Sequence, residues 1–189
     1  QDPNYNAATK RWHMEIGGGT VSFILAKGGT KIDFTRGLVN WSGPQDNRVV
    51  LDGTIGRDGS SGAPRTDLIL VEGTDNVLSG FEIRGEFSVA AIIVRQGAAN
   101  NQFGPGLVFA GMPQGVGIVF ENRGTVANKV IGSWCGITGD GRQVDPLADD
   151  CIRFHSGAGA SIVGGPAPQD RNVLVGSSRG VGVSVEGLA

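Results

Sequence analysis

The chain has 189 residues and a formal net charge of −2; 18% of its residues are charged and 39% are hydrophobic. This length and balance are those of one folded domain rather than a disordered chain, and the lack of a basic cluster or a long apolar run argues against nucleic-acid binding and a membrane span. Glycine is unusually frequent, with 33 residues, but follows no strict triplet, which excludes collagen. Many glycines and few charges are typical of short strands joined by tight turns.

The N-terminal segment, residues 1–15, carries no repeat and is expected to form an arm or a cap. We divide the chain there, with residues 16–189 as a single β-helix domain. Three aliphatic stretches, at residues 19–25, 30–35 and 48–53, have the character of short strands and are interpreted as the opening coils.

A repeat becomes apparent from residue 68 onward. A β-branched or aliphatic run that closes on a glycine recurs at spacings of 24 to 33 residues, ending at Gly73, Gly97, Gly124, Gly157 and Gly187. After a polar turn, a second short run follows most of them, at residues 76–80, 128–132, 161–165 and 172–176. Each unit therefore contains a strand, a turn with Asn or Gly, a second strand and a longer loop.

Stacking of these units is the arrangement that physics favours. A short strand cannot bury an apolar face alone, whereas the same strand of successive coils can pair in a parallel sheet and align its Ile, Val, Leu and Phe side chains in rows. A β-sandwich would require short hairpins that the sequence mostly lacks, and propeller blades are longer than this period. The sequence therefore predicts an all-β fold, a right-handed parallel β-helix (β-solenoid).

The chain has two cysteines, Cys135 and Cys151, which lie 16 positions apart. They form either a disulfide that closes the polar loop between them or a reduced pair buried as small hydrophobic residues. We favour the disulfide, which an extracellular location permits. Asn40 begins an Asn-Trp-Ser sequon and is a glycosylation candidate.

The glycine- and asparagine-rich runs at residues 160–165, 171–176 and 180–185 resemble the parallel β-helix repeats of the pectate-lyase-like superfamily, in particular the arrays of microbial surface proteins. The resemblance extends over about residues 48–189. It implies a scaffold and does not by itself imply an activity.

A second, local resemblance begins at Asp149-Asp150-Cys151-Ile152, which is similar to a signature of polygalacturonase-type glycoside hydrolases. It implies acid catalysis and water activation by paired aspartates, here Asp149 and Asp150 with Asp145 as a third carboxylate. The Gly-His-Gly of that family would fall on residues 180–182, where valine replaces the histidine. No histidine–cysteine metal spacing occurs, and we predict no cofactor.

The last residues, 180–189, belong to a good repeat and are followed by no polar capping segment in the sequence. Either the repeat continues in a longer chain, or the last coil stacks on the first coil of a neighbour, which would generate a filament. For such a contact we expect contributions from both ends of the chain: from Tyr5 and Trp12 at one end, and from Val181, Val183, Val185 and Leu188 at the other.

Our leading hypothesis is a non-enzymatic structural protein, located outside the cell or on its surface, whose partners are copies of itself in a head-to-tail filament or appendage. The absence of a signal peptide and the start at Gln1 favour a processed mature form or an excised fragment. The alternatives are a carbohydrate-active or carbohydrate-binding β-helix, with glycans as partners and the site near Asp149 and Asp150, and an adhesin segment of a larger surface protein.

Overall fold

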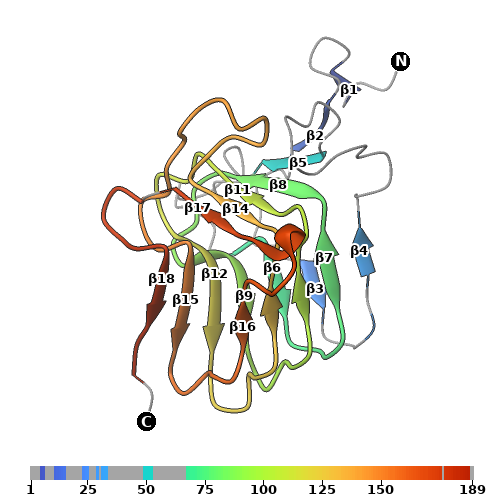
Figure 1. Cartoon of the computed structure of the whole chain (residues 1–189), viewed down its shortest axis with the longest axis vertical. Helices are drawn as coiled ribbons and strands as arrows, with labels where there is room; N and C mark the ends of the chain where they lie inside the picture. The colour runs from blue at the N-terminus through green and yellow to red at the C-terminus, as the bar shows by residue number, and fades with distance from the viewer. Residues whose placement is uncertain are drawn as a thin grey trace, which may run out of the picture.

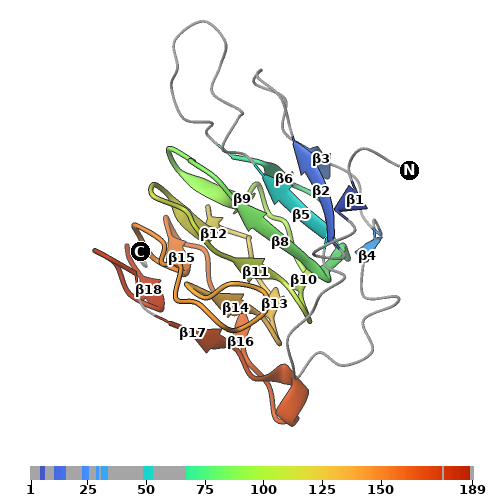
Figure 2. The same ribbon diagram turned by 90° about the horizontal axis from the view of Figure 1, so that it is seen from above.

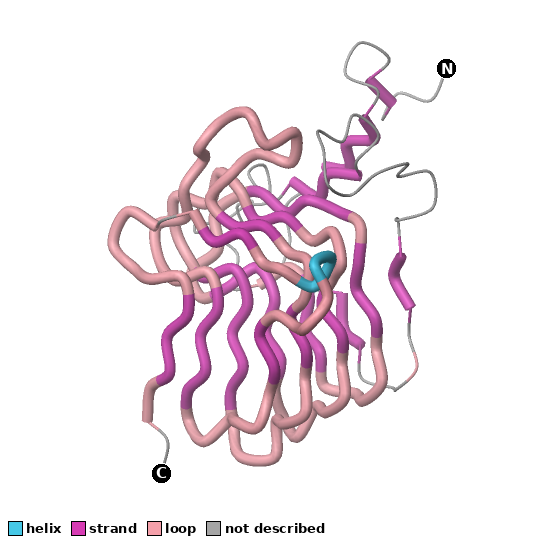
Figure 3. The backbone as a smooth tube through the Cα atoms, viewed as in Figure 1, coloured by secondary structure: helices cyan, strands magenta, loops and turns pink. Residues whose placement is uncertain are grey.

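The computed structural model describes residues 5–6, 11–15, 23–25, 29, 31–33, 49–52, 67–175 and 177–187. Within these ranges the protein is all-β, as predicted: it contains no α-helix, and its only helical element is one 3-10 turn, η1 (Pro168–Asp170). Figure 3 shows this turn in cyan among the magenta strands.

The described strands form three sheets, which we call A, B and C. Sheet A consists, in order, of β1 (Tyr5–Asn6), β2 (Arg11–Glu15), β5 (Val49–Asp52), β8 (Phe81–Arg84), β11 (Val108–Phe109), β14 (Trp134–Cys135) and β17 (Val173–Leu174). Sheet B consists of β3 (Phe23–Leu25), β6 (Ile69–Val71), β9 (Ala90–Val94), β12 (Val116–Glu121), β15 (Ile152–His155) and β18 (Val183–Val185). Sheet C consists of β4 (Lys31–Asp33), β7 (Val77–Ser79), β10 (Gln102–Phe103), β13 (Lys129–Val130) and β16 (Ile162–Val163).

Successive strands of one sheet come from successive turns of the chain. All the strand pairs are parallel except β1 with β2, and each coil contributes one strand to sheet B, then one to sheet C and one to sheet A. Figure 1 shows the strands of sheet B side by side from β3 to β18, and Figure 2 shows the coils following one another toward the C-terminal strands. This parallel, coiled arrangement is consistent with a β-solenoid.

The structure has three strands per coil, whereas the repeat pattern predicted two. The additional strands include β10, β11 and β14, which have two residues each. A strand this short shows no period-two alternation, so it leaves no pattern in the sequence. The three opening stretches do form strands, namely β3, β4 and β5. Residues 11–15 of the expected N-terminal arm pair with β5 as strand β2, and β1 pairs antiparallel with β2 at the edge of sheet A.

The core lies between the three sheets and is built from inward-facing rows. One row on sheet B contains Ile69, Ile92, Ile118, Ile152 and Val183, and the next contains Val71, Val94, Phe120, Phe154 and Val185. Phe120 stacks on Phe154, with ring centroids 4.7 Å apart, and meets Phe103 of sheet C edge-on at 5.6 Å. Such ladders hold neighbouring coils together because each coil buries the apolar face of the preceding one.

A ladder of polar side chains lies inside the turn between sheets B and C. Asn101 Nδ2 donates a hydrogen bond to Oδ1 of Asn128 (3.0 Å), and Asn76 Nδ2 donates one to Oδ1 of Asn101 (2.8 Å). The backbone N–H groups of Asn76 and Asn101 donate to the same two oxygen atoms. Ser161 replaces asparagine in the next coil, where its Oγ accepts from the backbone N–H of Asn128 (3.2 Å).

The outer face of sheet B carries a second apolar cluster, separate from the core. Its members are Leu70, Ala90, Ile93, Val116 and Val119, all of them buried. In the next two coils the row that contains Leu70, Ile93 and Val119 continues with Arg153 and Ser184. The outer face of sheet B therefore changes from apolar to polar at β15, and this change positions the candidate site.

Candidate functional site at the C-terminal coils

Asp149 and Asp150 lie immediately before β15, at the junction of two coils. Asp150 is 4% exposed, and both of its carboxylate oxygen atoms accept hydrogen bonds. Its Oδ1 accepts from the backbone N–H of Val181 (2.8 Å), and its Oδ2 accepts from Ser184 Oγ (2.5 Å) and from Arg153 Nε (2.8 Å). Val181 and Ser184 belong to the following coil, so this carboxylate connects two coils.

Arg153 joins the two aspartates. Its Nη2 donates to Asp149 Oδ1 (2.7 Å), and its Nε lies 4.0 Å from Glu186 Oε1. Burial lowers the pKa of the Arg153 guanidinium, but the two aspartates outweigh this effect and hold that pKa above its usual range. The guanidinium is therefore a permanent positive charge between Asp149 and Asp150.

The same contacts set the charge of Asp150. Burial by itself raises the pKa of the Asp150 carboxyl, but the hydrogen bonds from Ser184, from the Val181 N–H and from Arg153 together hold that pKa below its usual range. Asp150 is thus ionised at neutral pH and accepts from three donors at once. A general acid for glycoside hydrolysis needs the opposite, a carboxyl whose pKa is raised.

Asp145, the third carboxylate of the hydrolase hypothesis, has different neighbours. Its Oδ2 lies 3.5 Å from Arg84 Nη1, and its backbone accepts from the N–H of Gly111. Among the described residues, no hydrogen bond or ion pair joins Asp145 to Asp149 or Asp150. The structure therefore brings two of the three carboxylates together, around Arg153, and places the third beside Arg84.

Cys135 and Cys151, the pair for which the sequence favours a disulfide, are bonded in the structure. Both residues are 1% exposed and belong to the core. The bond joins β14 of sheet A to the residue that precedes β15 of sheet B, and it closes the loop that carries Asp145 and Asp149. No group of three or more His, Cys, Asp and Glu side chains that could hold a metal ion occurs in the described part of the chain.

The valines predicted to take part in self-association are exposed on the last described coil. Val181 is 52% exposed, Val183 40% and Val185 57%. Tyr5 and Trp12 lie opposite each other in the β1–β2 pair, but their side chains lie outside the described part of the structure. Leu188 and Asn40 also lie outside the described residues.

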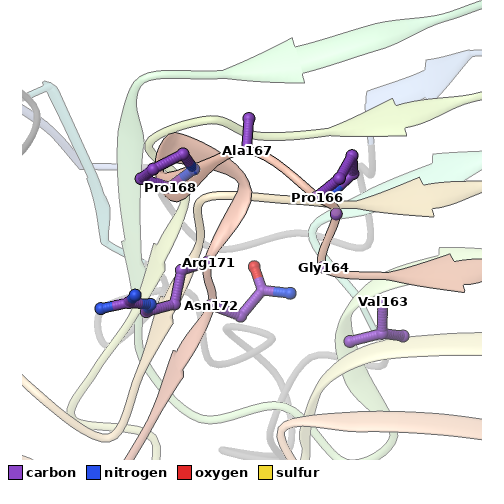
Figure 4. Close-up of a pocket in the computed structure, with 8 residues that line it drawn as sticks. Val163, Gly164, Pro166, Ala167, Pro168, Arg171 and Asn172 are labelled. Atoms are coloured by element: carbon purple, nitrogen blue, oxygen red, sulfur yellow. The ribbon is translucent and has the colours of Figure 1, made fainter.

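A hollow, which the sequence did not indicate, lies at the turn between β16 and β17. Figure 4 shows it bordered by Val163, Gly164, Pro166, Arg171 and Asn172. The Asn172 amide is already engaged: its Oδ1 accepts from the Ser133 N–H (2.9 Å), and its Nδ2 donates to the Val130 carbonyl (2.9 Å). Apart from Arg171, the lining has no charged side chain.

The preceding coils explain this hollow. Gly104 occupies the position of Gly164 two coils earlier, and a Cβ added to it would lie 1.8 Å from the carbonyl oxygen of Ile131 in the following coil. At Gly164 the nearest such atom is 4.0 Å away. The hollow beside Gly164 therefore corresponds to the space that the following coil fills at Gly104.

Comparisons with known proteins identify no relative: no family model, no curated protein and no solved structure matches the chain. Among the described residues, no helix has the length and apolar character needed to cross a membrane.

Proposed function

We propose that this chain is a structural protein, a right-handed parallel β-helix of the pectate-lyase-like type, that stacks head to tail into an extracellular filament or surface appendage. The observation that carries the proposal is the exposure of Val183 and Val185. They continue two core rows whose upstream members on sheet B are at most 7% exposed. One more coil laid on β18 would bury them in the same way.

The described edges of the sheets support a second copy as the cover. Sheets A, B and C end at β17, β18 and β16 on the C-terminal side, and sheets B and C end at β3 and β4 on the other side. All of these strands pair in parallel with their inner neighbours, so β18 of one copy can add to β3 of the next with unchanged polarity. Such a contact joins two different surfaces and does not close, which produces a filament.

The carbohydrate-active alternative has less support from the geometry. Its central residue, Asp150, is buried and has all its hydrogen bonds within the protein. A catalytic carboxylate must reach the glycosidic oxygen or the attacking water. The arrangement around Asp150 instead favours a role in holding two coils together.

Replacement of a core-row valine by lysine tests the proposal. We expect the unmodified protein to associate with increasing concentration in sedimentation velocity and to form filaments in negative-stain electron micrographs. Val183→Lys should abolish association, because a charge at this position cannot be buried without a partner. Circular dichroism should show that the variant remains folded.

Val144 provides a matched control. It is 67% exposed on the disulfide-closed loop, opposite Ile137, and belongs to none of the three terminal edge strands. Val144→Lys introduces the same charge and should leave association unchanged. If the unmodified protein stays monomeric over the whole concentration range, or if both variants lose association equally, the proposed stacking surface is wrong.

A further inference from the structure

The last described coil has little apolar packing of its own. The inward side chains of β18 are 40% and 57% exposed, whereas the equivalent residues of β12, Ile118 and Phe120, are 0% exposed. Backbone pairing with β15 spans three positions, from Val183 to Val185. It is extended at one end by the hydrogen bond from Glu186 N–H to the Phe154 carbonyl (2.7 Å), and at the other by those from the Cys151 and Ile152 N–H groups to the carbonyls of residues 181 and 182 (3.1 and 3.2 Å). Residues 181–187 therefore need another source of stabilisation.

Side-chain hydrogen bonds to one carboxylate fill this need. Asp150 accepts from Val181 at the start of the coil and from Ser184 in the middle of β18, while Arg153 holds the carboxylate from its own coil. We call Asp150, Arg153, Ser184 and the Val181 N–H the Asp150 clamp. Hydrogen bonds to an ionised group are about twice as strong as neutral ones, and the buried position of Asp150 shields them from water.

The clamp replaces apolar contacts that upstream coils use at the same place. In the row of Arg153, the upstream residues Ile93 and Val119 belong to the buried outer cluster of sheet B. At β15 and β18 this row becomes Arg153 and Ser184. In this row, a contact that does not depend on pH is thus replaced at β15 and β18 by one that requires a charged carboxylate.

We propose that the Asp150 clamp orders the edge strand β18 and thereby controls whether the C-terminal coil can receive a neighbour. The control of association rests on the proposed stacking function, whereas the ordering of residues 181–187 does not. With the carboxylate ionised, the edge strand is held in line with sheet B. With the carboxylate neutral, the coil detaches while the rest of the stack stays folded, so acid acts as a release signal.

The direction of this pH dependence follows from the contacts. The pKa of Asp150 in the folded protein lies below its value in the unfolded chain, so its stabilising effect is complete above the unfolded pKa of about 4. The effect is lost as the pH falls through the lower pKa of the folded state. The charged groups that face the clamp are Asp149, Arg153 and Glu186. Because Asp149 and Glu186 also carry carboxyl groups, a variant is needed to assign the transition to Asp150.

Hydrogen exchange read out by mass spectrometry tests the ordering directly. In Asp150→Asn, the amides of residues 181–187 should lose about ten- to hundredfold of their protection at neutral pH, the effect of losing charge-assisted bonds. Protection in β9 and β12 should not change. The unmodified protein should show the same local loss when the pH falls below about 4, and Asp150→Asn should show no such additional step.

Asp149→Asn is the matched control. Asp149 is the more exposed of the two aspartates and shares Arg153, but among the described residues its side chain makes no hydrogen bond or ion pair to the following coil. This variant should keep protection at residues 181–187. Ser184→Ala, which removes one donor at the exposed edge, provides a milder second variant if Asp150→Asn does not fold.

Sedimentation velocity on the same variants separates the two proposals. Association by the unmodified protein that is lost in Asp150→Asn and retained in Asp149→Asn supports the control of stacking. If residues 181–187 lose protection in Asp150→Asn but no form associates, the clamp stands and the stacking function fails. If Asp150→Asn keeps both its protection and its association, the clamp is wrong.

Discussion

Thr125 is a polar side chain in an apolar row. It lies between Ala98 and Ala158 of the adjacent coils, and all three residues are 0% exposed. Its Oγ1 has no hydrogen-bond partner among the described residues. A buried hydroxyl without a partner destabilises the folded state, because it loses its hydrogen bonds to water on folding.

We therefore expect Thr125→Val to raise the free energy of unfolding by about 1 kcal/mol, since a methyl group of the same shape replaces the hydroxyl. Urea unfolding followed by circular dichroism measures the change. Thr125→Ser is the control, because it keeps the hydroxyl and removes the methyl group; it should lower the stability. An unchanged or lower midpoint for Thr125→Val would show that the hydroxyl is satisfied.

At the scale of the elements, the asparagine ladder fixes how one turn sits on the next. Asn101 is the central member: its amide donates to Asn128 and to the Gly73 carbonyl (3.0 Å), and its Oδ1 accepts from Asn76. It is 1% exposed, so water cannot replace a lost partner. The ladder thus fixes the register of three successive coils at the turn between sheets B and C.

Asn101→Ala should lower the free energy of unfolding by about 2–4 kcal/mol, because it leaves polar groups of both neighbouring coils buried without partners. The midpoint of urea unfolding is the measurement. Asn100 provides the control: it precedes Asn101, is exposed and has a left-handed backbone with φ of 57°. Asn100→Gly is compatible with that backbone and should change the stability by less than about 0.5 kcal/mol.

At the scale of the whole molecule, the disulfide limits the freedom of the unfolded chain. It joins residues 16 positions apart, a loop for which the chain-entropy model gives about 3 kcal/mol of stabilisation. The double variant Cys135→Ala/Cys151→Ala should lose about this amount in urea unfolding. Reduced protein without substitutions should unfold at a similar midpoint. Equal stability of the oxidised protein and the double variant would contradict this prediction.

The disulfide lies inside the stack of coils, because both of its cysteines are buried. It connects β14 of sheet A, the last strand of one coil, to the residue before β15 of sheet B, the first strand of the next, beside the junction held by Asp150. The C-terminal coils thus have one covalent and one ionic constraint close together. The coils before β12 have no disulfide in the described structure; they are held by apolar rows, by the asparagine ladder and by the ion pair between Arg95 and Glu72 (3.0 Å).

Much of the architecture follows from the sequence because stacking imposes a local pattern. Rows such as Ile92, Ile118 and Ile152 must recur at the length of one coil, so the repeat, the all-β class and most strands of sheets B and C are visible in one chain. The asparagines before β7 and β13 and the glycines after sheet B strands are visible for the same reason. For Cys135 and Cys151 the sequence leaves both a disulfide and a reduced buried pair open, and only the packing that brings the two residues together decides between them.

The role of the paired aspartates depends on contacts that only the tertiary structure makes. In the sequence, Asp149 and Asp150 stand out because they resemble a hydrolase signature. Such a signature describes only residues that are adjacent in the chain. The donors that give Asp150 its role, Val181 and Ser184, lie 31 and 34 residues away, in the following coil. The number of residues per coil varies, so no fixed separation in the sequence identifies two residues that meet across coils. The sequence by itself therefore determined the stacking scaffold, and the three-dimensional packing decided which residues connect its last two coils.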